Sequence, residues 1–181
     1  MSSLIQTSGR ESYSAISVIN HWITVLLVMA MLILGLLASA APDSAEDFIM
    51  SVHVSLGFFV FWFVLWRAAY RVHQGFPPTQ GQTPWQRQLA WWVHRLVLGL
   101  LVLQVFTGPL YLFTENEGVN VFGWFTVLIP LESLAFIHEP VEVLHVITGL
   151  YVLPALLLLH IVGAFHYFWQ RRSVTPAELG E

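Results

Sequence analysis

The sequence predicts an all-α protein, an integral membrane four-helix bundle. Hydrophobic residues make up 56% of its 181 residues and charged residues only 10%, which is far from the average of a soluble domain. Four stretches without Asp, Glu, Lys or Arg are long enough to cross about 30 Å of hydrocarbon, which takes roughly 20 helical residues. They are residues 16–41, 48–66, 96–114 and 143–170. We expect them to form a single transmembrane domain over residues 1–181.

The first stretch has an alternative interpretation as a secretory signal. Arg10 precedes it, and the sequence ASA at 38–40 is typical of a cleavage site. The run is longer than a typical signal core and contains His21 and Trp22. We therefore interpret it as the first span.

A fifth apolar run, residues 118–131, lies between the third and fourth spans. It is shorter than a span and is broken by Gly123 and Pro130. These features predict an interfacial loop or a short surface helix.

All positive charges fall on one side of the predicted bundle. The chain has no lysine, and its seven arginines lie in the N-terminal tail, the connection between spans two and three, or the C-terminal tail. Because cytoplasmic loops carry the excess of Arg and Lys, we expect both termini in the cytoplasm. The opposite side holds only carboxylates, which are Asp43, Glu46, Asp47, Glu115, Glu117, Glu132, Glu139 and Glu142.

Histidine is the residue expected to carry any transition-metal chemistry. The chain has no cysteine, which excludes disulfides, thiolate zinc sites and iron–sulfur clusters. Buried ionisable groups in a span are costly and are usually functional. Six of the eight histidines lie in or at the ends of spans, and they are His21, His53, His94, His145, His160 and His166.

Four of these histidines fall at two depths. His53 and His145 enter from the outer side and share one level, whereas His21 and His160 lie within about a turn or two of an inner level. His145 and His160 are fifteen residues apart on one helix, about 22 Å of rise and about 60° of rotation, and Pro154 between them can loosen the helix. Two histidines per level suit a bis-imidazole haem, whose iron takes one nitrogen from each face of the porphyrin.

A short repeat accompanies the outer histidines. The sequences HVSLG at 53–57 and HVITG at 145–149 each place a glycine four residues after the histidine, on the same helix face. Gly57 and Gly149 would leave room for a macrocycle lying against the helix. The alternative is that both are packing glycines of the kind common in membrane helices.

The whole pattern resembles the bacterial cytochrome b561 family, small four-span di-haem proteins related to the cytochrome b subunits of nickel–iron hydrogenases. The resemblance runs from about Tyr13 to Arg172. It rests on ISVINHW, VHVSLGFFVFWFVLWRAAYRV, WVHRLVLGLLVLQVFTGPLYL, EVLHVITGLY and LLLLHIVGAFHYFW, in this order.

The resemblance implies two haem b groups and their axial ligands. It places the ligands on spans one and two and twice on span four, at His21, His53, His145 and His160, and the depths pair His53 with His145 outside and His21 with His160 inside. The two histidines on the family's fourth span usually stand fourteen residues apart, whereas here they stand fifteen apart. A bulge near Pro154 would absorb the extra residue. Without one, His166 becomes the rival inner ligand.

Three further residues are candidates for cofactor binding. His94 matches a histidine that the family also carries, with an expected place near the inner haem or a quinone such as ubiquinone. Arg67 and Arg71, one turn apart, suit the haem propionates. Their alternative role is in topology and contact with lipid headgroups.

Two bis-histidine haems leave no open coordination site, so they suit electron transfer. We expect electron transfer in the bacterial inner (cytoplasmic) membrane between a donor at the outer face, such as a basic periplasmic redox protein, and the quinone pool. Three alternatives are a haem-bearing anchor subunit of a dehydrogenase such as a hydrogenase, a superoxide oxidase coupled to quinone reduction, and a proton or metal transporter. No nucleotide-binding loop, nucleophile elbow or zincin motif occurs, so no catalytic residue is assigned. No nucleic-acid partner is expected.

Overall fold

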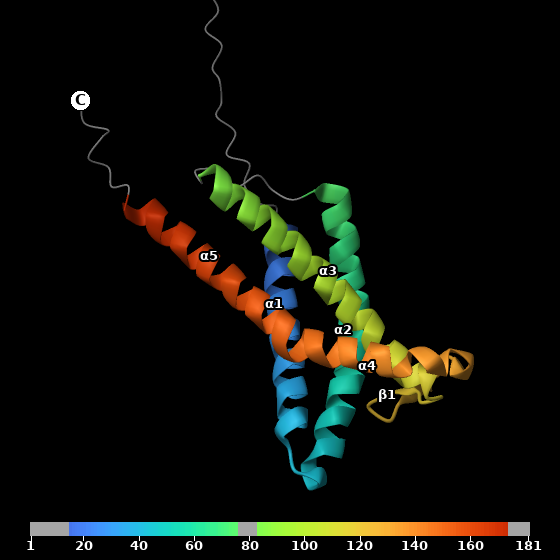
Figure 1. Ribbon diagram of the computed structural model, residues 1–181. Helices are drawn as coiled ribbons and strands as arrows, with labels where there is room; N and C mark the ends of the chain where they lie inside the picture. Colours follow the sequence, from blue (N-terminus) through green and yellow to red (C-terminus); the bar gives the residue numbers. More distant parts are fainter. Residues whose placement is uncertain (1–14, 76–82, 174–181) are drawn as a thin grey trace, which may run out of the picture.

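The structure, a computed structural model, describes residues 15–75 and 83–173 and consists mainly of long helices (Figure 1). The tail that carries Arg10 lies outside the described residues. Four helical segments are long and apolar enough to cross a membrane, and the last of them includes two helices. The predicted four-helix membrane protein is therefore confirmed. The helices are α1 (Ala15–Ala40), α2 (Asp43–Gln74), α3 (Pro84–Thr114), α4 (His138–Ile147) and α5 (Leu153–Ser173).

Local sequence sets the ends of α2 and α3. Asp43 and Glu46 lie in the first turn of α2, where negative charge complements the helix dipole. Gly75 ends α2 at a φ of 75° and donates its N–H to the Arg71 carbonyl, a conformation that favours glycine. Thr83 and Gln86 form a capping box at the start of α3. Both helices thus extend beyond their predicted apolar spans.

The ends of the helices define two sides of the molecule. The first, here called the termini side, contains the start of α1, the end of α2, the start of α3 and the end of α5. The second, here called the hairpin side, contains the α1–α2 connection and the segment that joins α3 to α4. Figure 1 shows α1 and α2 as an antiparallel pair, with α3 beside α2 and the α4–α5 segment crossing the bundle.

A two-stranded antiparallel hairpin follows α3 where a loop or surface helix was expected. Its strands are β1 (Val119–Val121) and β2 (Phe125–Val127). The Ser55 hydroxyl on α2 donates to the Asn120 carbonyl at 3.0 Å and accepts from the Phe122 N–H at 2.9 Å. Ser55 and Val121 are buried at this contact. The hairpin is thus attached to α2, and it is followed by the 3₁₀ helix η1 (Glu132–Ile137).

The fourth spanning segment is not one regular α-helix. A π-helical segment, η2 (Thr148–Val152), separates α4 from α5, and the ribbon changes direction there (Figure 1). The side-chain amide of Gln104 on α3 donates to the His145 carbonyl at 3.0 Å, just before this segment. A π-helical turn interrupts the regular ladder of backbone hydrogen bonds. The His145 carbonyl also accepts from the Thr148 N–H, so Gln104 gives it a second donor beside the interruption.

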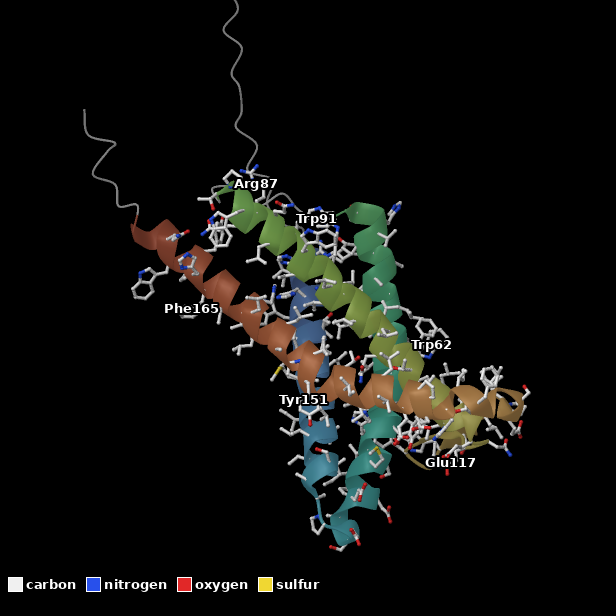
Figure 2. The ribbon with its side chains drawn as sticks, viewed as in Figure 1. Trp62, Arg87, Trp91, Glu117, Tyr151 and Phe165 are labelled. Atoms are coloured by element: carbon white, nitrogen blue, oxygen red, sulfur yellow. The ribbon has the colours of Figure 1, made fainter. Side chains whose placement is uncertain are left out.

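The described helices bury few apolar side chains against one another. The small central core consists of Val28, Val60, Val64, Leu101 and Leu153. Large apolar side chains cover the outside instead, including Leu26 on α1 at 70% exposure. Trp62 and Phe165 point away from the helices in Figure 2 and are also exposed. Such an apolar exterior is what a lipid environment requires, and the chain is a multi-pass membrane protein.

Candidate functional site

On the hairpin side of the core, the structure brings His53 and His145 together. His53 lies on α2 and His145 on α4, with ring centroids 6.4 Å apart and ring planes at 90°. A metal–imidazole bond is about 2.0–2.1 Å long. Adding about 1.1 Å from each nitrogen to its ring centre places two imidazoles on opposite sides of one metal at about 6.3 Å. The observed separation fits that arrangement.

The same calculation applies to His21 and His160 on the termini side. His21 lies on α1 and His160 on α5, with ring centroids also 6.4 Å apart and ring planes at 68°. Each predicted pair is thus assembled from two different helices, and both histidines of each pair are partly buried.

His94 is a third histidine on the termini side. Its ring centroid is 4.9 Å from that of His160, too close for two imidazoles on opposite sides of one metal. Its Nδ1 is hydrogen-bonded to the Ala90 carbonyl of the same helix, and the side chain is exposed. His94 therefore lies beside the His21–His160 pair, at its edge.

The rival residue His166 lies apart from these histidines. It is on the exposed surface of α5, where its Nε2 is 3.0 Å from the Gln170 side-chain amide. Six residues of helix turn it by about 240° from His160. The geometry therefore favours His160 over His166 as the partner of His21.

Arg67 and Arg71 line the termini-side pair from α2. Arg67 donates to Asn20 Oδ1 at 2.7 Å and lies 3.4 Å from His21 Nδ1. Arg71 donates to the Ser17 hydroxyl at 2.7 Å. A guanidinium can only donate hydrogen bonds, so Nδ1 of His21 must accept in this contact. The ring proton is then on Nε2, and Nε2 has no lone pair with which to bind a metal. Metal binding through Nε2 requires Arg67 to release His21.

The π-helical segment explains how two histidines fifteen residues apart on the fourth spanning segment can lie at the two levels. The other three long helices each carry a comparable pair fourteen residues apart, which is about 21 Å of rise. A π-helical turn holds one extra residue. The two histidines fifteen residues apart are therefore separated by nearly the same rise and rotation as a fourteen-residue pair on a regular helix. The pairs are His21 and Gly35 on α1, His53 and Arg67 on α2, His94 and Gly108 on α3, and His145 and His160 on the α4–α5 segment.

Each level therefore receives one residue from every spanning segment. On the termini side the four are His21, Arg67, His94 and His160, linked by the contacts given above. On the hairpin side they are His53, His145, Gly35 and Gly108. A Cβ at Gly35 would lie 3.6 Å from His53 Cε1, and one at Gly108 would lie 3.1 Å from His145 Cε1. These two glycines each face a histidine ring of another helix.

The predicted glycines Gly57 and Gly149 contact neighbouring helices. A Cβ at Gly57 would lie 3.4 Å from Met31 Cε on α1, and one at Gly149 would lie 2.7 Å from Gln104 Nε2 on α3. Both positions thus permit close approach of another helix. The residues around Gly35 and Gly108 in the sequence do not indicate a role for these glycines, because each faces a histidine of another helix. The fourteen-residue spacing to His21 and His94 was the available clue.

His145 and His53 differ in their hydrogen bonds. His145 Nδ1 lies 3.0 Å from the hydroxyl of Thr107, a buried residue of α3 that the sequence interpretation did not include. Within the described part of the chain, His53 Nδ1 is buried without a hydrogen-bonded side chain, and the polar group beside the ring is the Met31 backbone. The two imidazoles of the hairpin-side pair are therefore held differently.

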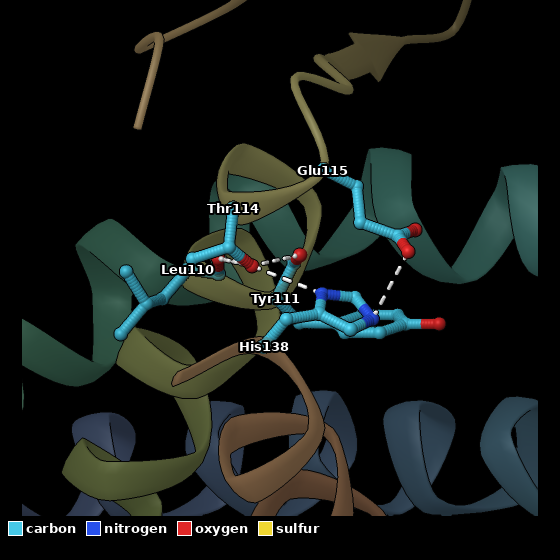
Figure 3. Close-up of polar contacts among 5 residues, drawn as sticks. All are labelled: Leu110, Tyr111, Thr114, Glu115 and His138. Atoms are coloured by element: carbon cyan, nitrogen blue, oxygen red, sulfur yellow. Dashed lines mark hydrogen bonds and ion pairs between the residues drawn. The ribbon is translucent and has the colours of Figure 1, made fainter. Parts of the chain in front are cut away.

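A separate polar cluster joins the end of α3 to the start of α4 (Figure 3). The ring of His138 stacks on Tyr111, with centroids 4.8 Å apart. Its Nδ1 lies 3.0 Å from the Thr114 hydroxyl and its Nε2 lies 3.2 Å from a Glu115 carboxylate oxygen. The cluster belongs to the surface that carries all eight carboxylates of the hairpin side. Among the described residues, that surface contains no arginine.

The residues present fit a haem at each level. The donor set at each level consists of two imidazole rings at the required separation, and Gly35 and Gly108 let their helices approach the hairpin-side rings. Within the described ranges, no group of three or more His, Asp or Glu side chains could hold a bare metal ion. Paired imidazoles between helices instead suit a planar cofactor that supplies four equatorial ligands itself.

Fold and site together define a multi-pass membrane protein with opposed imidazole pairs in its core. The chain belongs to the prokaryotic cytochrome b561 family, whose sequence model matches residues 12–177. It is therefore a b-type cytochrome, a haem-binding membrane protein of electron transport. Among curated proteins, no sequence matches the chain.

Proposed function

We propose that the protein is a di-haem cytochrome that carries electrons between a donor at the hairpin side and the quinone pool. The observation that carries this proposal is the presence of two imidazole pairs, each with ring centroids 6.4 Å apart. Each bound haem supplies one-electron redox chemistry. The protein determines its position, its potential and its access to water.

The ligands in this proposal are His53 and His145 at one haem and His21 and His160 at the other. Arg67 and Arg71 supply the positive charge for haem propionates near the His21–His160 pair. Such a role agrees with the need for Arg67 to release His21 on metal binding. His94, exposed beside His160, is then placed to contact a quinone headgroup or the edge of the second haem.

The charge distribution supports a bacterial inner membrane location with the termini in the cytoplasm. Arg67 and Arg71 near the end of α2, and Arg87 and Arg95 near the start of α3, all lie on the termini side, where the positive-inside rule places the cytoplasm. The donor then approaches the acidic hairpin side from the periplasm. That surface attracts a basic redox protein and presents no barrier to a neutral quinol, but it repels the superoxide anion.

Counting haems in ligand variants tests the proposal. The purified protein should contain about two haems per chain by the pyridine haemochromogen assay, and His53→Ala, His145→Ala, His21→Ala and His160→Ala should each retain about one. His166→Ala and His138→Ala are matched controls that should retain two. One haem in the parent protein would contradict the di-haem proposal. Loss of haem from His166→Ala but not from His160→Ala would move the ligand to His166.

A further inference from the structure

We infer that Thr107 is a positioning residue that fixes the tautomer of His145 and lowers the reduction potential of the hairpin-side haem. This inference rests on the proposed function, because it concerns one of the proposed haem ligands. Thr107 is 5% exposed and lies on α3, the helix that faces His145 across the core. Its hydroxyl oxygen is 3.0 Å from His145 Nδ1.

The direction of this hydrogen bond follows from the other partners of the hydroxyl. Thr107 Oγ1 lies 3.0 Å from the Leu103 carbonyl and 3.2 Å from the Gln104 carbonyl of its own helix. Its single proton serves one of these acceptors, so its lone pairs face the ring. His145 Nδ1 must then carry the proton and donate it to Thr107. A neutral imidazole has one N–H, so Nε2 keeps the lone pair that binds iron.

Two other groups of α3 keep the ring in this position. Gln104 donates to the His145 backbone carbonyl at 3.0 Å. Gly108 approaches the ring so closely that a Cβ there would be 3.1 Å from Cε1. One turn of α3 thus holds the backbone, the ring face and Nδ1 of the same histidine.

The bond also changes the electronic character of the ligand. An imidazole that donates Nδ1–H to an oxygen becomes a more basic ligand, and a more basic ligand stabilises the oxidised metal. His53, across the same site, has no hydroxyl partner within the described residues, and the polar group beside its ring is the Met31 backbone. Thr107 is therefore the hydrogen-bonding group through which the protein lowers the potential of this haem, and its effect acts through His145 alone.

Redox titration of Thr107 variants tests the inference. Thr107→Val preserves the shape but removes the hydroxyl, and it should shift the reduction equilibrium of one haem about tenfold toward the reduced form, which is 59 mV for one electron. Thr107→Ser keeps the hydroxyl and should titrate like the parent protein. Thr24→Val is the matched control, since the hydroxyl of buried Thr24 donates to the Asn20 carbonyl of its own helix. The potentials are read from the visible absorption of purified protein with two haems.

The outcomes separate this inference from the proposed function. A parent protein with fewer than two haems contradicts the proposed function, whatever Thr107 does. Two haems with unchanged potentials in Thr107→Val, or an equal shift in Thr107→Ser, overturns the inference alone. If Thr107→Val loses a haem, Thr107→Ala provides the same test with a smaller side chain. If Thr107→Val and Thr107→Ala both lose a haem while Thr107→Ser keeps two, the hydroxyl is required to hold His145 in position.

Discussion

Replacement of Gly108 by alanine tests how closely α3 approaches the His145 ring. The added Cβ would lie 3.1 Å from Cε1 and 3.7 Å from Nδ1 of that ring. Carbon atoms pack best at about 3.5–4.0 Å, so the ring or the helix must move by roughly 0.4–0.9 Å. His145 cannot move freely, because Thr107 and Gln104 of the same helix hold it. We expect the movement to weaken both bonds and to displace the proposed ligand nitrogen.

Gly99→Ala provides the matched control on the same helix, because no atom lies within 4 Å of a Cβ there. Both variants gain up to about 1 kcal/mol from the better helix propensity of alanine. Only Gly108→Ala pays for overpacking, which typically costs 1–3 kcal/mol. Gly108→Ala should therefore be less stable than Gly99→Ala by about 1–3 kcal/mol.

Thermal unfolding in detergent, together with haem content, measures this difference. Gly108→Ala should unfold at a lower temperature than Gly99→Ala and should hold less than two haems. Gly35→Ala is a second comparison, because its Cβ would make an ordinary 3.6 Å contact with His53 Cε1. It should retain both haems. If Gly108→Ala matches Gly99→Ala in both measurements, α3 does not approach His145 as the structure places it.

Two further predictions concern the π-helical segment and the donor. Gly149→Ala should displace Gln104, because the new Cβ would lie 2.7 Å from its Nε2. The lost bond to the His145 carbonyl should cost about 0.5–1.5 kcal/mol in thermal unfolding, whereas Gly163→Ala, with open space around it, should cost nothing. The acidic hairpin side predicts that added salt slows haem reduction by a cationic redox protein and speeds reduction by superoxide. In stopped-flow experiments, superoxide reduction that is fast at low salt and slows as salt rises would show a local positive field and make superoxide the leading donor.

Much of the fold was predictable because lipid imposes simple rules. Charge-free runs of sufficient length identified the four spans, and helix rise alone placed His53 with His145 and His21 with His160. These deductions need only distance along a helix. They do not depend on which helix lies beside which.

The features that escaped prediction depend on contacts between helices. The hairpin at residues 119–127 has strands of three residues each, too short for a clear alternating pattern, and it is held by Ser55 from a distant part of the chain. The closeness of Thr107 to His145 and of Gly108 to the same ring depends on the register of α3 against α4. Sequence spacing within one helix carries no information about that register.

The π-helical segment Thr148–Val152 has a consequence for comparing this chain with other sequences. In a related chain with a regular helix here, the two histidines stand fourteen residues apart. If its first histidine is aligned with His145, its second is aligned with Leu159 and not with His160. The extra residue that shifts the match lies inside a transmembrane segment, at its π-helical turn. The residue equivalent to that second histidine must therefore be identified from the helical register in three dimensions. A count of residues from His145 would select a leucine.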